Sequence, residues 1–286
     1  MSNSEKTIST VEALVAATGD EAVRHIIISG AIDNLPTIRL RPGQTLQGSG
    51  RDALLRFADN DGVELSSNNR ISNIRLETSP EKRAIFNDTA VDTIGRAELA
   101  AVTTIGRVQI LFRDKLRAGH VEVDGLDIIA ADARAETDRP KGYGVYVLQG
   151  AFTLWNMHAD ESIIISANLV GLSAGRDGAP VRGSGIFVSG GGDQAGRLAV
   201  RSLETDAVYS DGGIKAGTPD QITGGVFTVY GTYVDAVHNR GPVVTYGVND
   251  MVLDNWGPWT AGPPTRRSRP TDQAASALSI LARSTN

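Results

Sequence analysis

The sequence contains no cysteine, which excludes disulfide bonds and metal sites built on thiolates. Aromatic residues make up only 5% of its 286 residues. Its apolar runs, such as SIII at residues 162–165, are far shorter than the roughly 20 residues that cross a bilayer, so we expect no membrane partner. The first ten residues, MSNSEKTIST, lack the charged and then apolar order of a secretory signal, and we therefore expect a cytoplasmic protein.

Basic residues are not in excess either. The formal net charge is -5, whereas proteins that bind nucleic acid concentrate Lys and Arg on one face. The four histidines show no recognised zinc-binding spacing. Glycine-rich phrases such as residues 190–192 lack the lysine and the helix of a phosphate-binding loop. The sequence thus predicts no nucleic-acid partner, no metal and no cofactor.

The chain is instead rich in glycine, with 32 residues, and in short apolar bursts separated by Gly, Asn, Asp and Ser. This pattern is typical of short strands and turns. Successive bursts begin about 20 residues apart, at GVYVL (144), SIIIS (162), GIFVS (185), AVYSD (207), GVFTV (225) and PVVTY (242). Such strands bury their inner faces only by stacking at ~4.8 Å, so the sequence predicts an all-β, right-handed parallel β-helix solenoid.

Two other folds are compatible with parts of this pattern. An antiparallel sandwich uses tight hairpins, and the Asp-Gly pairs that begin at Asp61, Asp124 and Asp211 keep that alternative open. A doubly wound α/β fold needs helices between its strands, but only residues 9–18, STVEALVAAT, have helical apolar spacing. We expect this single helix, with a Ser or Thr N-cap, to cover the N-terminal end of the solenoid.

From residue 7 to residue 76 the chain shows a helix, the strand HIIISGAI, the phrase QTLQGSG at residues 44–50 and the phrase NNRISNI at residues 68–74. This order is similar to the N-terminal region of the pectate lyase-like superfamily of right-handed parallel β-helices. The resemblance implies a lyase, hydrolase or epimerase of acidic sugars. The Trp-x-Asp-His phrase of pectate lyases proper is absent, since residues 155–158 read WNMH, so calcium-assisted pectate cleavage is not expected.

Composition divides the chain into three parts. Residues 1–22 are an N-terminal segment with the capping helix, residues 23–262 the parallel β-helix, and residues 263–286 an irregular or helical tail. The regular pattern stops near Trp259, and the tail contains only the short helix-like AASALSILA. Two explanations remain open: a natural C-terminal cap, or a reading-frame shift that leaves the last rung open to self-association.

The outer surface of a parallel sheet brings residues of successive rungs within ~5 Å of one another, and enzymes of this fold use such surfaces for acid, base and cationic groups. We expect the catalytic residues to be Asp211, Lys215, Arg182 and His238. Ser166, Ser189 and Tyr246 fall at comparable strand ends. The alternative is that these polar residues only form turns.

Alternation along three of the bursts is expected to direct aromatic side chains outward. The valines and isoleucines are predicted to point inward: Val145, Val147, Ile186, Val188 and Val226. The expected substrate-binding residues are three outward aromatics and two strand-end residues: Tyr146, Phe187, Phe227, Gln149 and Tyr230. Sugar stacking, a subunit interface and a covering segment are three open explanations for the aromatic face.

Two functions from different classes follow. One is a carbohydrate-active enzyme whose partner is an oligo- or polysaccharide. The other is a non-catalytic β-helix scaffold that binds a partner, or forms a homo-oligomer, through the outer aromatic face. The missing lyase phrases and the missing export signal favour the scaffold, whereas the superfamily resemblance favours the enzyme.

Overall fold

The computed structural model describes residues 4–257, which form two large sheets and one helix, α1 (Val11–Gly19). All pairs of strands in these residues are parallel except β13 and β14. The first sheet contains β1 (Glu5–Ile8), β2 (His25–Ile28), β3 (Ala31–Leu35), β5 (Thr45–Gly48), β6 (Leu54–Phe57), β8 (Arg70–Glu77), β10 (Thr93–Ile105), β12 (Ala118–Ala130), β16 (Ile164–Ala174), β17 (Val181–Arg182), β19 (Arg197–Asp211), β21 (Thr232–Val234), β22 (Val237–Asn239) and β23 (Val243–Thr245). The second sheet contains β4 (Ile38–Arg39), β7 (Val63–Leu65), β9 (Arg83–Asn87), β11 (Arg107–Phe112), β13 (Lys141–Gly142), β14 (Val145–Val147), β15 (Gly150–Asn156), β18 (Ser184–Ser189), β20 (Gln221–Thr228) and β24 (Asp250–Asn255).

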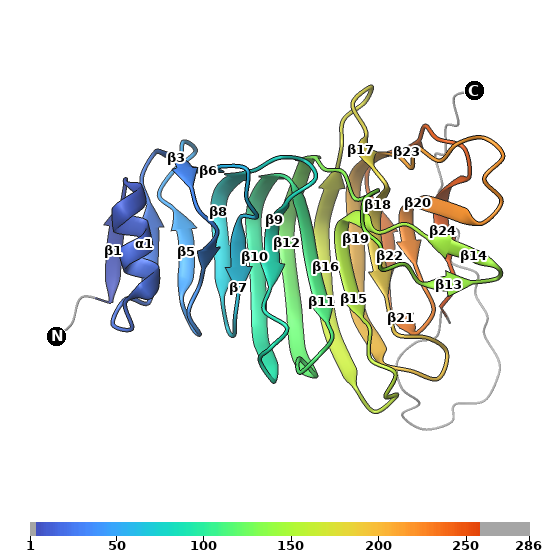
Figure 1. Ribbon diagram of the computed structural model, residues 1–286, viewed down its shortest axis with the longest axis horizontal. Helices are drawn as coiled ribbons and strands as arrows, with labels where there is room; N and C mark the ends of the chain where they lie inside the picture. The colour runs from blue at the N-terminus through green and yellow to red at the C-terminus, as the bar shows by residue number, and fades with distance from the viewer. Residues whose placement is uncertain (1–3, 258–286) are drawn as a thin grey trace.

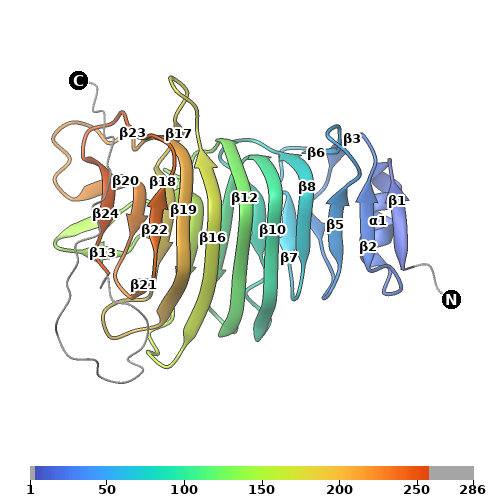
Figure 2. The ribbon, with the colours of Figure 1, turned by 180° about the vertical axis from the view of Figure 1, so that it is seen from behind.

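The chain passes repeatedly from one sheet to the other. From β8 to β12, for example, successive strands belong to the two sheets in turn. The long strands β10, β12, β16 and β19 lie side by side in the first sheet (Figures 1 and 2). One end of the molecule carries α1 and β1, and the other carries β13, β14 and β24 (Figure 1). The all-β architecture with parallel strands that the sequence predicts is therefore present.

The main core consists of apolar side chains stacked in rows from strand to strand. One row crosses five strands of the first sheet and is almost completely buried: Ile71, Leu99, Val123, Leu169 and Leu203. Burying one such side chain contributes about 1.5–3 kcal/mol. Because side chains alternate along a strand, each of these residues leaves its neighbours pointing outward. The rows therefore fix both the register of the sheet and the residues on its outer face.

The long strands of the first sheet bend at one residue in the left-handed backbone conformation. These residues are stacked in four neighbouring strands: Asn73, Ala101, Gly125 and Gly171, with φ of 53°, 51°, 80° and 70°. Glycine and asparagine adopt this conformation most readily. The stack forms a corner at which each strand turns from one flat part of the sheet into the next.

The predicted N-terminal helix is confirmed, with a start two residues later than expected. The Thr10 hydroxyl accepts a hydrogen bond from the backbone N–H of Ala13 at 3.3 Å, which makes Thr10 the N-cap. Leu14 and Ala17 are fully buried against the first strands. The preceding strand β1, which pairs with β2, was not predicted because it has only one buried residue, Ile8.

The repeat of about 20 residues is only approximate. Val63 pairs with Ile85, 22 residues further on, whereas Val108 pairs with Phe152, 44 residues further on. The predicted series combined bursts from both sheets, since the burst at 162 leads into β16 and those at 185 and 225 lie in β18 and β20. Loops of unequal length separate the strands, so sequence spacing does not give the pairing.

Parallel pairing rules out the antiparallel sandwich for the described residues. Gly125 lies at a corner inside β12 and not in a hairpin. No helix within residues 4–257 is long and apolar enough to span a membrane. The predicted tail, residues 263–286, and the predicted end of the pattern at Trp259 lie outside the described residues.

Candidate functional site

The outer face of the first sheet carries two parallel rows of polar side chains before the corner. In the first row Arg96, His120 and Ser166 occupy paired positions on β10, β12 and β16. In the second row, two residues further along each strand, Glu98, Glu122 and Asn168 are paired in the same way, and Arg70 of β8 is paired with Glu98. Figure 2 shows these strands side by side. We call these seven residues the polar face.

Arginines link the two glutamates of the polar face. Arg70 Nη1 lies 2.6 Å from Glu98 Oε2, and Arg96 Nε lies 2.5 Å from Glu98 Oε1. Arg96 also reaches Glu122, with Nη2 at 3.2 Å from Oε2. The two arginines thus balance the two like charges that the register stacks on neighbouring strands.

His120 connects a serine to a glutamate. Its Nδ1 lies 2.8 Å from Ser166 Oγ, and its Nε2 lies 3.0 Å from Glu122 Oε2. Because a carboxylate only accepts hydrogen bonds, the contact with Glu122 assigns the proton to Nε2 and leaves the Nδ1 lone pair to accept from the Ser166 hydroxyl. A hydroxyl, a base and an oriented carboxylate in this order are the parts of a nucleophilic site.

Glu122 is held in its charged form. Burial raises the pKa of its carboxyl group, but hydrogen bonds from Asn168 and His120 and the positive charge of Arg96 outweigh burial and place the pKa below its ordinary value of 4.5. The Asn168 amide donates to Oε1 at 2.7 Å. Burial likewise raises the pKa of Glu98, and Arg96 and Arg70 lower it by more. Both glutamates are therefore anionic at neutral pH.

Beyond Ser166 the first row continues through Ala199 of β19 to Tyr233 of β21. Ala199 carries only a methyl group, so a small side chain separates the hydroxyl from the aromatic ring. Arg197 and Arg201 flank Ala199 along β19 and point to the same face by alternation. Arg197 lies 5.9 Å from the centre of the Tyr233 ring.

Arg201 is placed by a β-bulge. Ala167 pairs with Val200 and Leu169 pairs with Leu203, so two residues of β19, Arg201 and Ser202, face one residue of β16. The side chain of Arg201 is exposed and makes no hydrogen bond or ion pair with any residue in 4–257. Bulges commonly redirect side chains beside active sites. Here the bulge places Arg201 opposite Asn168 and two residues beyond Ala199, the partner of Ser166.

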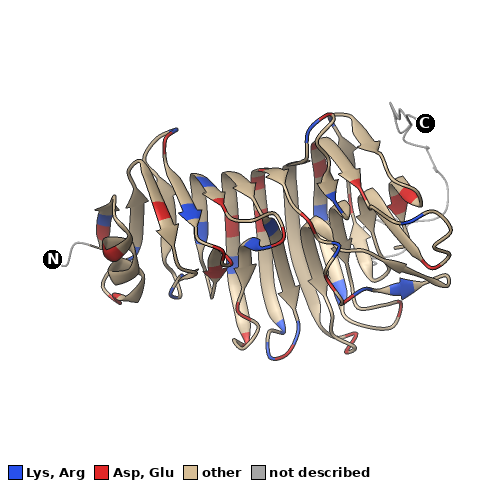
Figure 3. Cartoon of the chain, turned by 45° about the horizontal axis from the view of Figure 1, so that its top comes forward, with Lys and Arg blue, Asp and Glu red and all other residues tan. Residues whose placement is uncertain are grey.

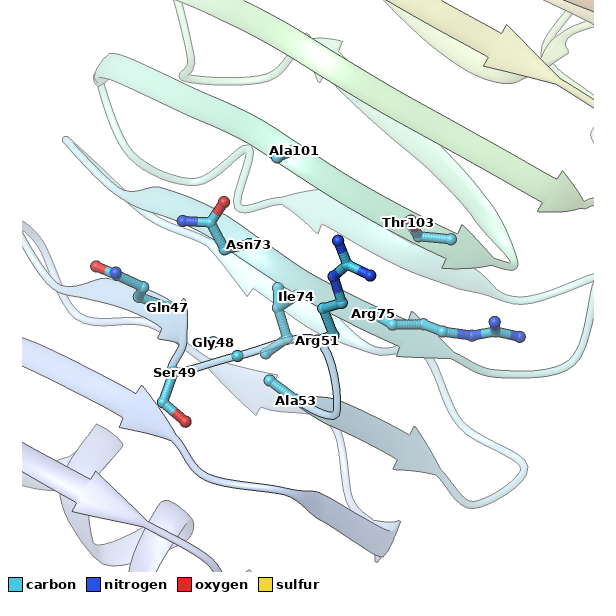
Figure 4. A pocket seen from close by; sticks show the side chains of 11 residues that line it. Gln47, Gly48, Ser49, Arg51, Ala53, Asn73, Ile74, Arg75, Ala101 and Thr103 are labelled. Atoms are coloured by element: carbon cyan, nitrogen blue, oxygen red, sulfur yellow. The ribbon is translucent and has the colours of Figure 1, made fainter.

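A separate pocket of about 600 Å³ lies at the corner, where β5, β8 and β10 meet (Figure 4). Arg51 projects over it from the loop between β5 and β6, and Arg75 lines it from β8. No acidic residue lines this pocket, which favours an anionic ligand. It is lined by Gln47, Gly48, Ser49, Gly50, Arg51, Ala53, Asn73, Ile74, Arg75, Ala101 and Thr103.

Of the four predicted catalytic residues, two are in direct contact in the structure. Arg182 and Asp211 occupy paired positions and form an ion pair. Asp211 also accepts the backbone N–H of Gly213 at 2.8 Å, which is a turn contact. Lys215 is exposed in a loop, and His238 lies on β22 opposite Glu204.

The ion pair of Arg182 and Asp211 lies beside a second ion pair, between Arg134 and Asp132. We call these four residues the Arg182 cluster. Arg134 binds Asp132, with Nε at 2.9 Å from Oδ1. Burial raises the pKa of Asp132, but hydrogen bonds from Arg134 and the positive charges of Arg134 and Arg182 lower it by more. The pKa therefore lies below its ordinary value of 3.8. Both acids of this cluster, Asp132 and Asp211, accept hydrogen bonds from other groups of the chain, which is the pattern of a structural network.

The exposed aromatic face that alternation predicts does not form. Phe187 and Phe227 point away from the main core, as expected, but both are fully buried in a second apolar cluster with Trp155 and Val147. The cover includes Trp256, whose ring centre lies 5.2 Å from that of Phe227. An outer sheet face that is covered cannot stack on a sugar.

The other predicted substrate-binding residues also have internal partners. Val145 and Val147, expected in the main core, join the second cluster, so alternation turns Tyr146 away from it, toward Lys141. Gln149 is 1% exposed and donates to the carbonyl of Asp138. Tyr230 stacks on Trp256 and donates its hydroxyl to the carbonyl of Lys141 at 2.5 Å.

Sequence reasoning missed the polar face because its residues lie far apart along the chain: His120 and Ser166 are 46 residues apart. The available signal was alternation, since His120 and Glu122 share one side of a strand, as do Ser166 and Asn168. Acidic and basic residues are interspersed along the molecule (Figure 3), so charge does not single out this face. Within residues 4–257 no cluster of His, Asp and Glu is suited to a metal ion.

No family model, no curated protein and no solved structure matches the chain. The chemistry of the polar face therefore has to follow from its own geometry.

Proposed function

We propose that the chain is a right-handed parallel β-helix of the pectate lyase-like kind and acts on carbohydrate at the polar face. The parallel strands, the alternation between two sheets and the stacked corner residues support the solenoid. A solenoid presents an elongated outer surface on which an extended polymer can lie across many strands.

One observation carries this proposal: a histidine, two glutamates and several arginines meet on one open sheet face. The row from Arg96 to Tyr233 crosses five strands, which spans about 19 Å at ~4.8 Å per strand. Tyr233 offers a ring for a sugar to stack on. Arg197 and Arg201 offer cations for the carboxylate of an acidic sugar. His120, two strands from Arg197 and Arg201 in the same sheet, is the acid–base group of this face.

The direct test uses a panel of uronate-containing and neutral glycans. Binding is followed by calorimetry, and turnover by unsaturated-product absorbance and by new reducing ends. We expect the acidic glycans to bind, and we expect Arg201→Ala to weaken this binding at least tenfold, on the scale of a lost charge-assisted hydrogen bond. Asp211→Ala, in the cluster on the other side of the corner, is the matched comparison and should bind as the unaltered protein does.

Two other outcomes would contradict the proposed site or the proposed function. Loss of binding in Asp211→Ala with normal binding in Arg201→Ala would place the glycan at the Arg182 cluster. Absence of binding to every glycan in the panel would contradict a carbohydrate function.

A second candidate function, self-association, is favoured by one surface residue. Tyr143, between β13 and β14, is 84% exposed and rests edge-on against Trp256, with ring centres 5.2 Å apart. Its φ of +51° is unusual for a bulky side chain. Exposed aromatic residues of this kind are enriched at protein interfaces. Sedimentation of the protein and of Tyr143→Ser over a hundredfold concentration range would show whether this residue joins two copies.

A further inference from the structure

We propose that Ser166 is a nucleophile that removes short acyl groups, such as acetyl, from hydroxyls of the bound sugar chain. This inference rests on the proposed carbohydrate function and adds a reaction to it. It is based on three residues of two adjacent strands that are joined by two consecutive hydrogen bonds: Ser166, His120 and Glu122.

The geometry meets the two requirements of an activated serine. The hydroxyl of Ser166 lies 2.8 Å from the Nδ1 of His120, within the range for proton transfer to a base. The opposite ring nitrogen lies 3.0 Å from Glu122, which fixes the tautomer and stabilises the imidazolium that forms. Glu122 is itself fixed by Asn168 and Arg96 on its two oxygens.

The surroundings of Ser166 suit an ester of a small acid. The neighbouring position on β19 is Ala199, whose methyl group leaves room for an acyl group of few atoms beside the hydroxyl. The backbone N–H groups on both sides of Ser166 belong to the ladders with β12 and β19, so they are not available to an oxyanion. The guanidinium of Arg201, which has no partner among residues 4–257, takes that role in our proposal.

The reaction balances without any further reagent except water. His120 Nδ1 takes the hydroxyl proton while Ser166 Oγ bonds to the ester carbonyl carbon, and the carbonyl π electrons move to the oxygen near Arg201. The bond from carbon to the sugar oxygen then breaks, and that oxygen takes the proton from His120. Water repeats the sequence on the acyl-serine, which releases a carboxylic acid and restores Ser166 and neutral His120.

The test measures acetate released from an O-acetylated polyuronate and, in parallel, from 4-nitrophenyl acetate. We expect Ser166→Ala and His120→Ala to lower kcat on the order of 10³-fold or more. Ser173→Ala is the matched control, because Ser173 lies on the same strand and donates to a carboxylate of β12, Asp127, at 2.7 Å. It should retain full activity.

A second readout does not depend on the natural substrate. A fluorophosphonate that phosphonylates activated serines should label the unaltered protein, and peptide mass spectrometry should find the label on Ser166. Glu122→Gln is expected to lower kcat with little change in KM, because Glu122 positions the histidine and does not touch the substrate.

The outcomes separate this inference from the proposed function. Acetate release that persists in Ser166→Ala, or a label on another residue, overturns the inference. Glycan binding without any acetate release also overturns it but leaves the carbohydrate function standing. Absence of both binding and release contradicts the two together.

Discussion

Buried asparagine side chains fix the turns between strands by binding the backbone of two successive passes. Asn156 at the end of β15 is fully buried, and its amide donates to the carbonyls of Ile163 and Arg197 at 3.1 and 2.9 Å. Its carbonyl accepts the backbone N–H of His158 at 3.3 Å. Asn69 has the same role further upstream, with bonds to Arg41, Gln44 and Ser66.

Asn156→Ala should therefore lower the free energy of unfolding by about 2–4 kcal/mol, since it leaves several buried backbone groups without partners. Urea denaturation measures this change. Asn60→Ala is the control, because Asn60 is only half-buried and its amide makes a single bond, to Leu35 at 3.3 Å. A change below 1 kcal/mol in Asn156→Ala would show that water replaces the lost bonds.

At the scale of elements, the corner stack explains how one continuous strand serves two flat parts of a sheet. Three residue types occupy the stack: asparagine, alanine and glycine. An added Cβ at Gly125 would meet the backbone of Ala101 at 3.6 Å, an ordinary contact distance. Space is thus available there, and the backbone conformation alone restricts the residue.

Gly125→Val and Gly125→Asn should accordingly behave differently. Valine is strongly disfavoured at positive φ and should cost about 2 kcal/mol or more, whereas asparagine, which already occupies the same position at Asn73, should cost well under half of that. Thermal unfolding of the two variants measures the difference. Equal melting temperatures would mean that the corner does not impose the left-handed conformation.

The N-terminal elements form a second unit at this scale. The buried Leu14 and Ala17 of α1 and the pairing of β1 with β2 cover the first strands of both sheets. Removing residues 1–22 would expose the edge of β2 and the side chains beneath α1. We expect such a protein to aggregate, as size-exclusion chromatography would show. A monomer with an unchanged melting temperature would contradict the capping role.

For the whole molecule, the carboxyl groups with shifted pKa values determine how the free energy of unfolding changes with pH. Carboxyl groups whose pKa is held below its ordinary value are spread along the chain: Asp20, Asp61, Glu98, Glu122, Asp132 and Asp160. Burial raises the pKa of two others, Glu64 and Asp254. The larger group decides the sign of the pH dependence.

A carboxyl group with a lowered pKa contributes stability that is complete above its unfolded pKa and is lost as the pH falls through its folded pKa. The ordinary values here are 3.8 for Asp and 4.5 for Glu. We therefore expect the free energy of unfolding to be lower at pH 3 than at pH 7. Urea titrations at pH 7, 4.5 and 3 measure it, and equal values at pH 3 and 7 would contradict this account.

The fold could be predicted from the sequence more completely than the candidate site. Inward positions such as Ile186, Val188 and Val226 follow from local alternation alone, and they are correct. The burial of Phe187 depends on a cover formed by distant segments that include Val147 and Trp256. The pairing of His120 with Ser166 depends on the length of the chain between them. Local patterns determine which side chains point inward, and only the register determines which of the outward ones meet.

The corner between β5 and β6 departs from the regular stack, because a loop stands where the neighbouring strands have a single corner residue. Gln47 pairs with Ser72 and Leu54 pairs with Arg75, so residues 48–53 occupy a stretch for which β8 needs only Asn73 and Ile74. The chain leaves the sheet at this corner and pairs with β8 again after the loop. The core side chains on the two sides of the loop, Leu46 and Leu55, are both fully buried. Loop length at a corner is thus independent of core packing. Insertions there can reshape the pocket beside Arg51 while the scaffold stays constant, so we expect this corner to tolerate changes in loop length.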